Sequence, residues 1–88
     1  MESVSSRLGR RIASDFPDPG SAEEVTRLVA RASDSERIQA AIVFAAQGDP
    51  REVLRQVELS QVDWRDVLVN GGLENEDWPA LLDQQLGR

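Results

Sequence analysis

The 88-residue sequence contains no cysteine and no histidine. Without cysteine the chain can form no disulfide and offers no thiolate nucleophile. Without histidine it lacks the commonest acid–base group and the commonest metal ligand in proteins. Catalysis would have to rest on carboxylates, arginines, hydroxyls and amides, and the sequence shows no nucleophile–base or metal constellation of these groups. We therefore expect a protein that is not an enzyme and that holds no metal or cofactor.

Long hydrophobic stretches are also absent. The longest apolar run is the segment 40–46, whereas a membrane-spanning helix needs about 20 residues. The first residues include arginines but lack the hydrophobic segment of a secretory signal. We expect a cytoplasmic protein that does not bind membranes.

Lysine is missing as well, because all ten basic residues are arginine, and sixteen acidic residues outnumber them. The net charge of −6 repels phosphate backbones at long range. This charge argues against non-specific binding to nucleic acids or to anionic membranes. A neutral or basic protein partner is favoured electrostatically.

An alanine-rich stretch in mid-chain organises the rest of the sequence. Four alanines surround Ile42, and alanine is the best helix former, which favours a helix over a buried strand. Ser33 and Glu36 have the spacing of a capping box, and Gly48 suits a left-handed residue at a helix end. We predict a central buried helix over about 34–47.

The burial of this helix is predicted from its angular pattern. At about 100° per residue, five apolar side chains form one arc: Ile38, Ala41, Ile42, Phe44 and Ala45. Gln39 and Gln47 mark the wetter side, and Val43 falls between them. We expect Val43 to be the least buried large side chain of this helix, or to be covered by another chain.

Residues 1–20 are expected to form an N-terminal arm, either a weak helix or a frayed end, and residues 21–88 the helical domain. Apolar residues recur every four positions from Val4 to Phe16, but Gly9 costs a helix about 1 kcal/mol relative to alanine. A second interpretation of the arm is a segment that becomes ordered on a partner.

A first amphipathic helix is predicted over residues 21–32. Ser21 and Glu24 have the spacing of a capping box. Glu23 lies four residues before Arg27, a spacing that favours an ion pair.

Another helix is predicted over residues 50–59. Asp49 is a good N-cap, and Pro50 suits the first helical position. The residues expected on its buried face are Val53, Leu54 and Val57. Arg51 and Arg55 then lie on the outer face.

Two short helices, over 64–70 and 78–86, complete the chain. Asp63 is expected to cap the first, and Val62 and Val67 fit a hydrophobic staple around its start.

The two tryptophans open these last two helices. Trp64 and Trp78 are interpreted as core anchors, because aromatic residues dominate burial in small cores. Alternatively one of them lies at an interface. Tryptophan and arginine are enriched at binding hot spots, and Arg65 directly follows Trp64.

Acidic clusters are the only candidates for a metal or acid–base site. Asp63 and Asp66 are better explained by helix capping and by the helix dipole. Residues 74–77 lack the alternating ligands of an EF-hand loop, so a solvated acidic loop is favoured. A small acidic metal-binding protein or enzyme is the second alternative function.

The central helix, the turn after it and the next helix resemble a helix-turn-helix in outline. Arg51 and Arg55 would then face a groove of DNA. A DNA-reading helix needs a basic footprint over most of its face, and Glu52 and Glu58 dilute it here. A nucleic-acid-binding domain is therefore the first alternative function, although nucleic acid is not the expected partner.

Three segments of the sequence carry a resemblance to a known family. They are S-E-R-I-Q-A-A-I-V-F-A-A-Q-G-D at 35–49, D-W-R-D-V-L-V at 63–69 and E-D-W-P at 76–79. Together they resemble a family of short uncharacterised bacterial helical proteins with an E-R-x-x-A-A-I stretch, then G-D, then D-W/Y-R-D-V-L. The resemblance implies a small bacterial cytoplasmic protein, and it brings no activity, cofactor or catalytic residue.

These observations predict an all-α fold, a compact bundle of four to five short helices around the central helix. The expected function is that of a non-enzymatic protein-interaction or regulatory module, with an unknown protein partner or self-association. The candidate interaction surface is apolar and arginine-bearing, and consists of Val43, Arg51, Arg55, Trp64 and Arg65.

Overall fold

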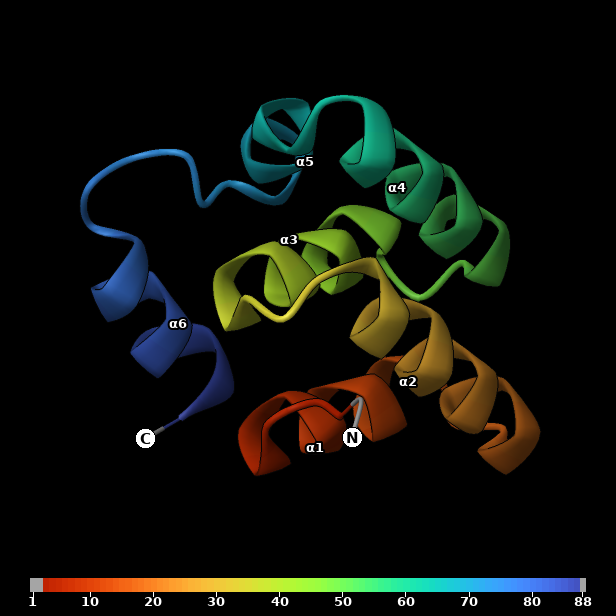
Figure 1. Cartoon of the computed structure of the whole chain (residues 1–88). Coiled ribbons are helices and arrows are strands. Elements are labelled where there is room, and N and C mark those ends of the chain that lie inside the picture. The colour runs from red at the N-terminus through yellow and green to blue at the C-terminus, as the bar shows by residue number, and fades with distance from the viewer. Residues whose placement is uncertain (1–2, 88) are drawn as a thin grey trace.

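The computed structural model describes residues 3–87 and confirms the all-α fold, with no strand in that part of the chain. It is a compact helical bundle (Figure 1). The helices are α1 (Ser6–Asp15), α2 (Pro19–Ala32), α3 (Glu36–Ala46), α4 (Pro50–Val62), α5 (Trp64–Gly71) and α6 (Trp78–Leu86).

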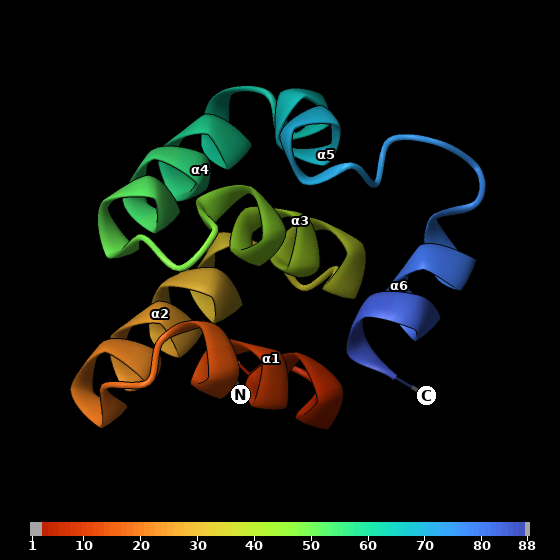
Figure 2. The same ribbon diagram turned by 180° about the vertical axis from the view of Figure 1, so that it is seen from behind.

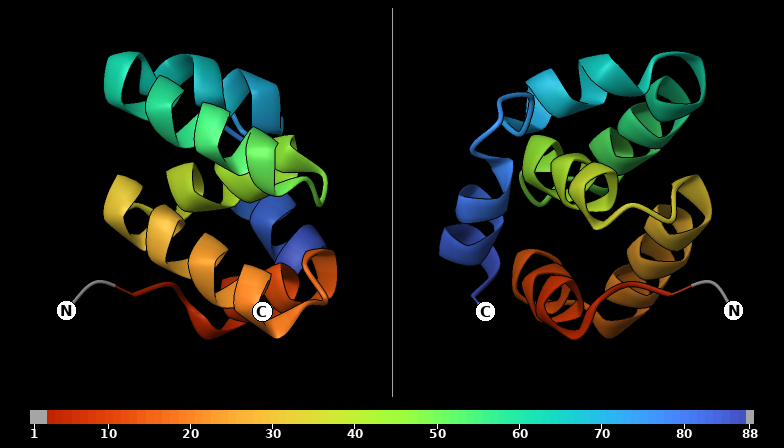
Figure 3. Two further views of the ribbon diagram at one scale, coloured as in Figure 1. Left: turned by 90° about the vertical axis from the view of Figure 1, so that its right-hand side faces the viewer. Right: turned by 60° about the vertical axis from the view of Figure 1, so that its left-hand side comes forward.

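The central position of α3 agrees with the prediction. Helix α3 contacts each of the other helices, and its contact with α5 is the most extensive. Helices α4 and α5 lie on one side of it, and α1 and α2 on the other, with α6 beside α1 (Figures 1 and 2). Two further views show α2 and α4 running side by side (Figure 3). Their C-terminal ends are joined by a hydrogen bond from Gln61 Nε2 to the Ala32 carbonyl at 3.1 Å.

The buried side of α3 differs from the predicted one. Ile42 is fully buried, but so is Val43, so the expectation that Val43 is the least buried large residue is wrong. Phe44 and Ile38 are only half-buried at the margin of the core. Gln39 is buried because its Nε2 donates to the Ser33 carbonyl at 2.6 Å, which satisfies the amide inside the protein.

The cap of α3 also differs from the predicted capping box. Ser35, not Ser33, is the N-cap, and its hydroxyl accepts from the Ile38 amide at 3.4 Å. Ser33 instead follows the last residue of α2. The Glu36 carboxylate is held by Arg7 of α1, so it does not close a capping box. Gly48 has a φ of 79°, in the left-handed region expected after the helix.

Residues 6–15 of the expected N-terminal arm form α1, which is part of the same core as the rest of the bundle. The apolar repeat of four residues that the sequence shows faces the core, since Leu8, Ile12 and Phe16 are all buried. Ser5 caps this helix by accepting from the Leu8 amide at 3.2 Å. Residues 3–87 therefore form six helices, one more than the upper end of the predicted range of four to five.

An arginine-centred network ties α1 to α3 and α6. Arg7 donates to both oxygens of Glu36, at 2.8 and 2.6 Å, and to Asp83 Oδ1 at 2.7 Å. It also donates to the Gly87 carbonyl at 2.9 Å, and Ser5 Oγ donates to Glu36 at 2.5 Å. We call these five residues the Arg7 hub.

The hub shifts the pKa values of Glu36 and Arg7. The hydrogen bonds from Arg7, helped by that from Ser5, lower the pKa of Glu36 below its ordinary value of 4.5, against the opposing effect of burial. Hydrogen bonds to Glu36 and Asp83 raise the pKa of Arg7 further above its ordinary value. Both shifts favour the charged pair in the folded state.

Gly71 explains why α5 lies so close to α3. A Cβ atom placed on Gly71 would be 2.5 Å from the Ala41 Cα and 2.6 Å from the Ala41 carbonyl oxygen. Only glycine lets the backbones of α3 and α5 approach each other this closely. Gly71 is the last residue of α5, and its role there is to permit this close packing.

Helix α2 begins earlier than predicted. Asp18 is its N-cap and accepts from the Ser21 amide at 3.1 Å, so the predicted Ser21–Glu24 capping box is wrong. Arg27 pairs with Glu24 at 2.6 Å, three residues away, rather than with Glu23.

The predicted caps of α4 and α5 are confirmed. Asp49 accepts from the Arg51 amide at 2.9 Å, and Asp63 accepts from the Arg65 amide at 3.1 Å. Helix α4 continues to Val62, three residues beyond its predicted end.

Candidate interaction surface

Exposed large apolar side chains are confined to two helices. Within residues 3–87 these side chains are Leu54, Val62, Trp64 and Val69, with exposed fractions of 49%, 86%, 47% and 57%. The first two belong to α4 and the others to α5. Single exposed apolar residues are normal, but here they gather on two consecutive helices.

On α4 the apolar and charged residues share one side. Leu54, Glu58 and Val62 follow at intervals of four residues and therefore form one stripe along the helix. Arg51 and Arg55 project from the same side, and both are exposed. This side faces away from the core because the opposite side carries the buried Val53.

The arginines of these helices have few internal partners. Arg55 makes one exposed ion pair, to Glu52 at 3.4 Å. The Arg65 guanidinium lies over the Trp64 ring, 5.5 Å from its centroid. The exposed Arg51 side chain forms no ion pair with another described residue. Arginine side chains with so few bonds can turn to a partner while losing few internal contacts.

We call the exposed apolar and arginine side chains of α4 and α5 the α4–α5 surface. Its members are Arg51, Leu54, Arg55, Val62, Trp64, Arg65 and Val69. Four of the five residues chosen from the sequence belong to it. Val43 does not, because it is fully buried within the bundle.

The predictions from the sequence missed or misplaced three members of the α4–α5 surface. Leu54 was expected inside, yet it lies at the edge of the face of α4 that meets α2. Val62 was expected to pack in a hydrophobic staple with Val67, but only Val67 is buried. The spacing of Val62 from Arg55 and Glu58 could have identified it as exposed. This spacing places Val62 on the polar side of α4, because the helix extends to Val62. Val69 carried no distinguishing signal.

The two tryptophans differ in environment. Trp64 is half exposed at the start of α5. Trp78 is partly buried against the core, and the Arg37 guanidinium lies 5.1 Å from its ring centroid. Arg37 also donates to the Leu73 carbonyl at 2.9 Å, which fixes the connection into α6. Core packing thus describes Trp78 better than Trp64.

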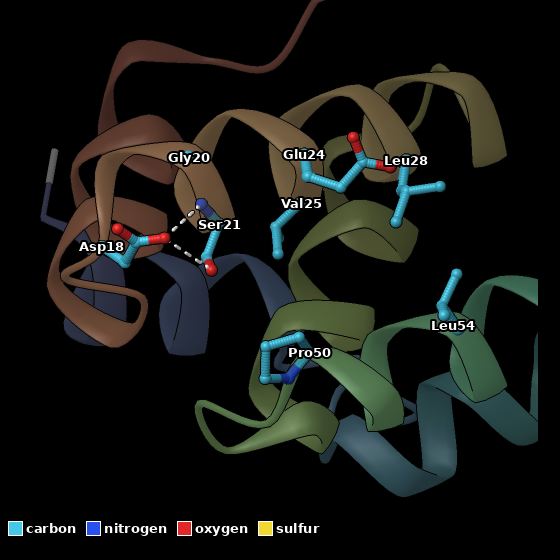
Figure 4. A pocket seen from close by; sticks show the side chains of 8 residues that line it. All are labelled: Asp18, Gly20, Ser21, Glu24, Val25, Leu28, Pro50 and Leu54. Atoms are coloured by element: carbon cyan, nitrogen blue, oxygen red, sulfur yellow. Dashed lines mark hydrogen bonds between the residues drawn. The ribbon is translucent and has the colours of Figure 1, made fainter.

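A groove of about 300 Å³ borders the α4–α5 surface at Leu54. It lies between α2 and α4 and is lined by Asp18, Gly20, Ser21, Glu24, Val25, Leu28, Pro50 and Leu54 (Figure 4). We call it the α2–α4 groove. Its apolar side chains form a hydrophobic floor, and its two charged side chains are both acidic.

The acidic residues considered as a metal site remain dispersed. In the described part of the chain, no group of three or more carboxylates is close enough together to hold a metal ion. Residues 74–77 are all exposed in the connection between α5 and α6.

None of the helices in residues 3–87 is long and apolar enough to cross a lipid bilayer.

Comparisons with protein-family models, with curated proteins and with solved structures find no match to this chain. The resemblance to a family of short bacterial helical proteins therefore stays a prediction. The candidate surface rests on the chemistry and geometry of its own residues.

Proposed function

We propose that this protein is a non-enzymatic interaction module that binds another protein through the α4–α5 surface. The observation that carries the proposal is the confinement of the large exposed apolar side chains of residues 3–87 to α4 and α5. A cytoplasmic setting and the absence of catalytic activity are parts of the same proposal.

The residue types of the surface support this function. Tryptophan and arginine are the residues most enriched at binding hot spots, and Trp64 and Arg65 are adjacent and in contact. Burying Val62, which is 86% exposed, would remove apolar area from water at little cost in side-chain order.

The charge of the whole chain narrows the choice of partner. Two copies with a net charge of −6 each repel one another at long range, so another protein that is neutral or basic is favoured over self-association.

Nucleic-acid binding by α4 receives less support from this geometry. Arg55 is paired with Glu52, and Glu58 lies in the stripe between Leu54 and Val62. A phosphate backbone would meet acidic and apolar groups along with the two arginines, instead of a continuous basic footprint.

The test is a comparative capture experiment with tagged full-length protein and extract of the cells that encode it. We expect a defined protein to be retained by wild type and by Gln84→Ser, an exposed position on α6, but not by Trp64→Ser or Val62→Ser. Thermal unfolding of each variant checks that the fold is intact. Retention of the same proteins by all four forms would contradict the proposal.

Sedimentation velocity of the purified protein accompanies this capture. A sedimentation coefficient that stays constant with concentration is expected if the partner is another protein. A dimer that dissociates in Trp64→Ser would instead identify a second copy as the partner.

A further inference from the structure

The α2–α4 groove has the shape to hold one large side chain of a partner. Its floor is apolar: Val25 is buried beneath it, and Leu28 and Leu54 border it from the two helices. A volume of about 300 Å³ exceeds that of one leucine or phenylalanine side chain. Gly20 and Pro50, at the N-terminal ends of α2 and α4, bring no long side chain into it.

The charged lining of the groove is acidic. Asp18 uses Oδ2 to accept from the amide and the hydroxyl of Ser21, both at 3.1 Å, and no bond within the described residues engages its Oδ1 (Figure 4). Glu24 is paired through Oε2 with Arg27, an exposed bond, and its Oε1 is open to another donor. Among the residues that the structure describes, no basic side chain lines the groove.

We propose that the α2–α4 groove binds a basic amphipathic helix of the partner protein, with one large apolar side chain on the floor and arginine or lysine side chains near Asp18 and Glu24. Helices of this kind dock into grooves through apolar anchors three and four residues apart. The net charge of −6 adds long-range attraction for a basic segment.

The groove and the α4–α5 surface are continuous. Leu54 belongs to both, since it lines the groove and is 49% exposed. A helix anchored at Leu54 would extend over α4, where Glu58 lies in the next turn of the same stripe. This inference rests on the proposed function, because it specifies the chemistry of the partner bound there.

The test uses two designed helical peptides of about 16 residues, long enough for four turns. Both carry leucines at helical spacing, and the remaining positions are mainly arginine in one and glutamate in the other. Titration calorimetry with the full chain should detect the arginine peptide alone, with an affinity that falls as salt concentration rises.

Three variants locate the site. Leu54→Gln removes the apolar wall at a half-exposed position, and we expect a loss of at least tenfold in affinity. Asp18→Asn with Glu24→Gln keeps a side chain able to cap α2 but removes both charges, which should weaken binding severalfold and flatten its salt dependence. Gln84→Ser, at an exposed position on α6 outside both the groove lining and the α4–α5 surface, should bind as wild type does.

Several results would overturn the inference. They are the absence of arginine-peptide binding, equal binding of both peptides, an equal loss in Gln84→Ser, and self-association that depends on Leu54. These results are distinguishable from failure of the proposed function. Suppose that a cellular partner is lost with Trp64→Ser but is still bound by Leu54→Gln and by the doubly neutralised variant. That result would support the proposed interaction module and would contradict only the inference that the α2–α4 groove binds the partner.

Discussion

The Arg7 hub and the α4–α5 surface use arginine in opposite ways. In the hub, one arginine donates to carboxylates on two other helices and to the carbonyl of Gly87, which follows α6. On the surface, three arginines together make one ion pair and one ring contact with residues that the structure describes, both within their own helix. The hub joins segments far apart in the sequence, whereas the contacts of the surface arginines are local.

This difference indicates that the Arg7 hub contributes to the stability of the fold, whereas the α4–α5 surface is available to bind a partner. Charge-assisted hydrogen bonds between part-buried groups contribute more than exposed pairs, which contribute about 0–1 kcal/mol. Substitutions in the hub should therefore alter unfolding, and substitutions on the surface should alter binding. Helix α3 contacts the helices that carry each region, so damage to its packing should affect both.

The largest expected effect is that of Gly71→Ala, which breaks the attachment of α5 to the core. The new Cβ would lie 2.5 Å from the Ala41 Cα, and a backbone atom cannot rotate away as a flexible side chain can. We expect a loss of about 1–3 kcal/mol in the free energy of unfolding, or more, measured by urea denaturation.

Gly9→Ala is the matched control in α1. Its Cβ would lie 3.9 Å from the nearest atom, a methyl of Val4, which is ordinary contact. Replacing glycine within a helix should raise stability by up to about 1 kcal/mol. Equal stability of Gly71→Ala and wild type would contradict the close approach of α3 and α5.

The next effect concerns the charge of the hub. Glu36→Gln keeps the size of the side chain but removes its negative charge beside Arg7. We expect about 1–2 kcal/mol lower stability than wild type at pH 7, because a charge-assisted bond becomes neutral. Both side chains are partly exposed, so solvent limits the loss.

The pH dependence of the stability difference tests whether the missing charge causes that loss. Because the folded-state pKa of Glu36 is lowered, the stability that its charge contributes is fully present above its ordinary pKa of 4.5. This stability is lost as the pH falls from that value through the folded-state pKa. The stability difference between wild type and Glu36→Gln should therefore shrink between pH 6 and pH 3. Urea midpoints at each pH measure it, and a difference independent of pH would exclude the charge as its origin.

Local signals predicted most of the fold. Asp49 and Asp63 cap the helices as read from the sequence, because an aspartate needs only the amides that follow it. The alanine-rich centre is also correct, since Ile42 and the alanines beside it have no better environment than the core.

The predictions failed where a side chain bonds to a group that the residue types around it do not reveal. Glu36 has the right spacing from Ser33 for a capping box, but Arg7, far away in sequence, provides a stronger partner. Gln39 is polar and was placed near water, yet a backbone carbonyl satisfies it inside the protein. Arg7 lies outside the sequence around Glu36, and the Ser33 carbonyl, although only six residues from Gln39, is a backbone group that no residue type marks as its partner.

The candidate surface was predicted only in part for the same reason. Arg51 and Arg55 are outside because charged side chains avoid burial without a partner. Val43 and Leu54 were misassigned because both are apolar, and which of them is buried depends on how α2, α3 and α4 pack. Composition does not determine that packing.

The smallest expected effect is that of Val62→Ser, and it sharpens the comparison most directly. Val62 is 86% exposed, and valine and serine have similar helix propensities, so stability should change by no more than about 0.5 kcal/mol. Val67→Ser is the matched control, because Val67 is fully buried and the change should cost about 2 kcal/mol or more. Urea denaturation measures both. A large loss for Val62→Ser would mean that Val62 stabilises the fold itself, and the α4–α5 surface would then lose its most exposed apolar residue as a recognition element.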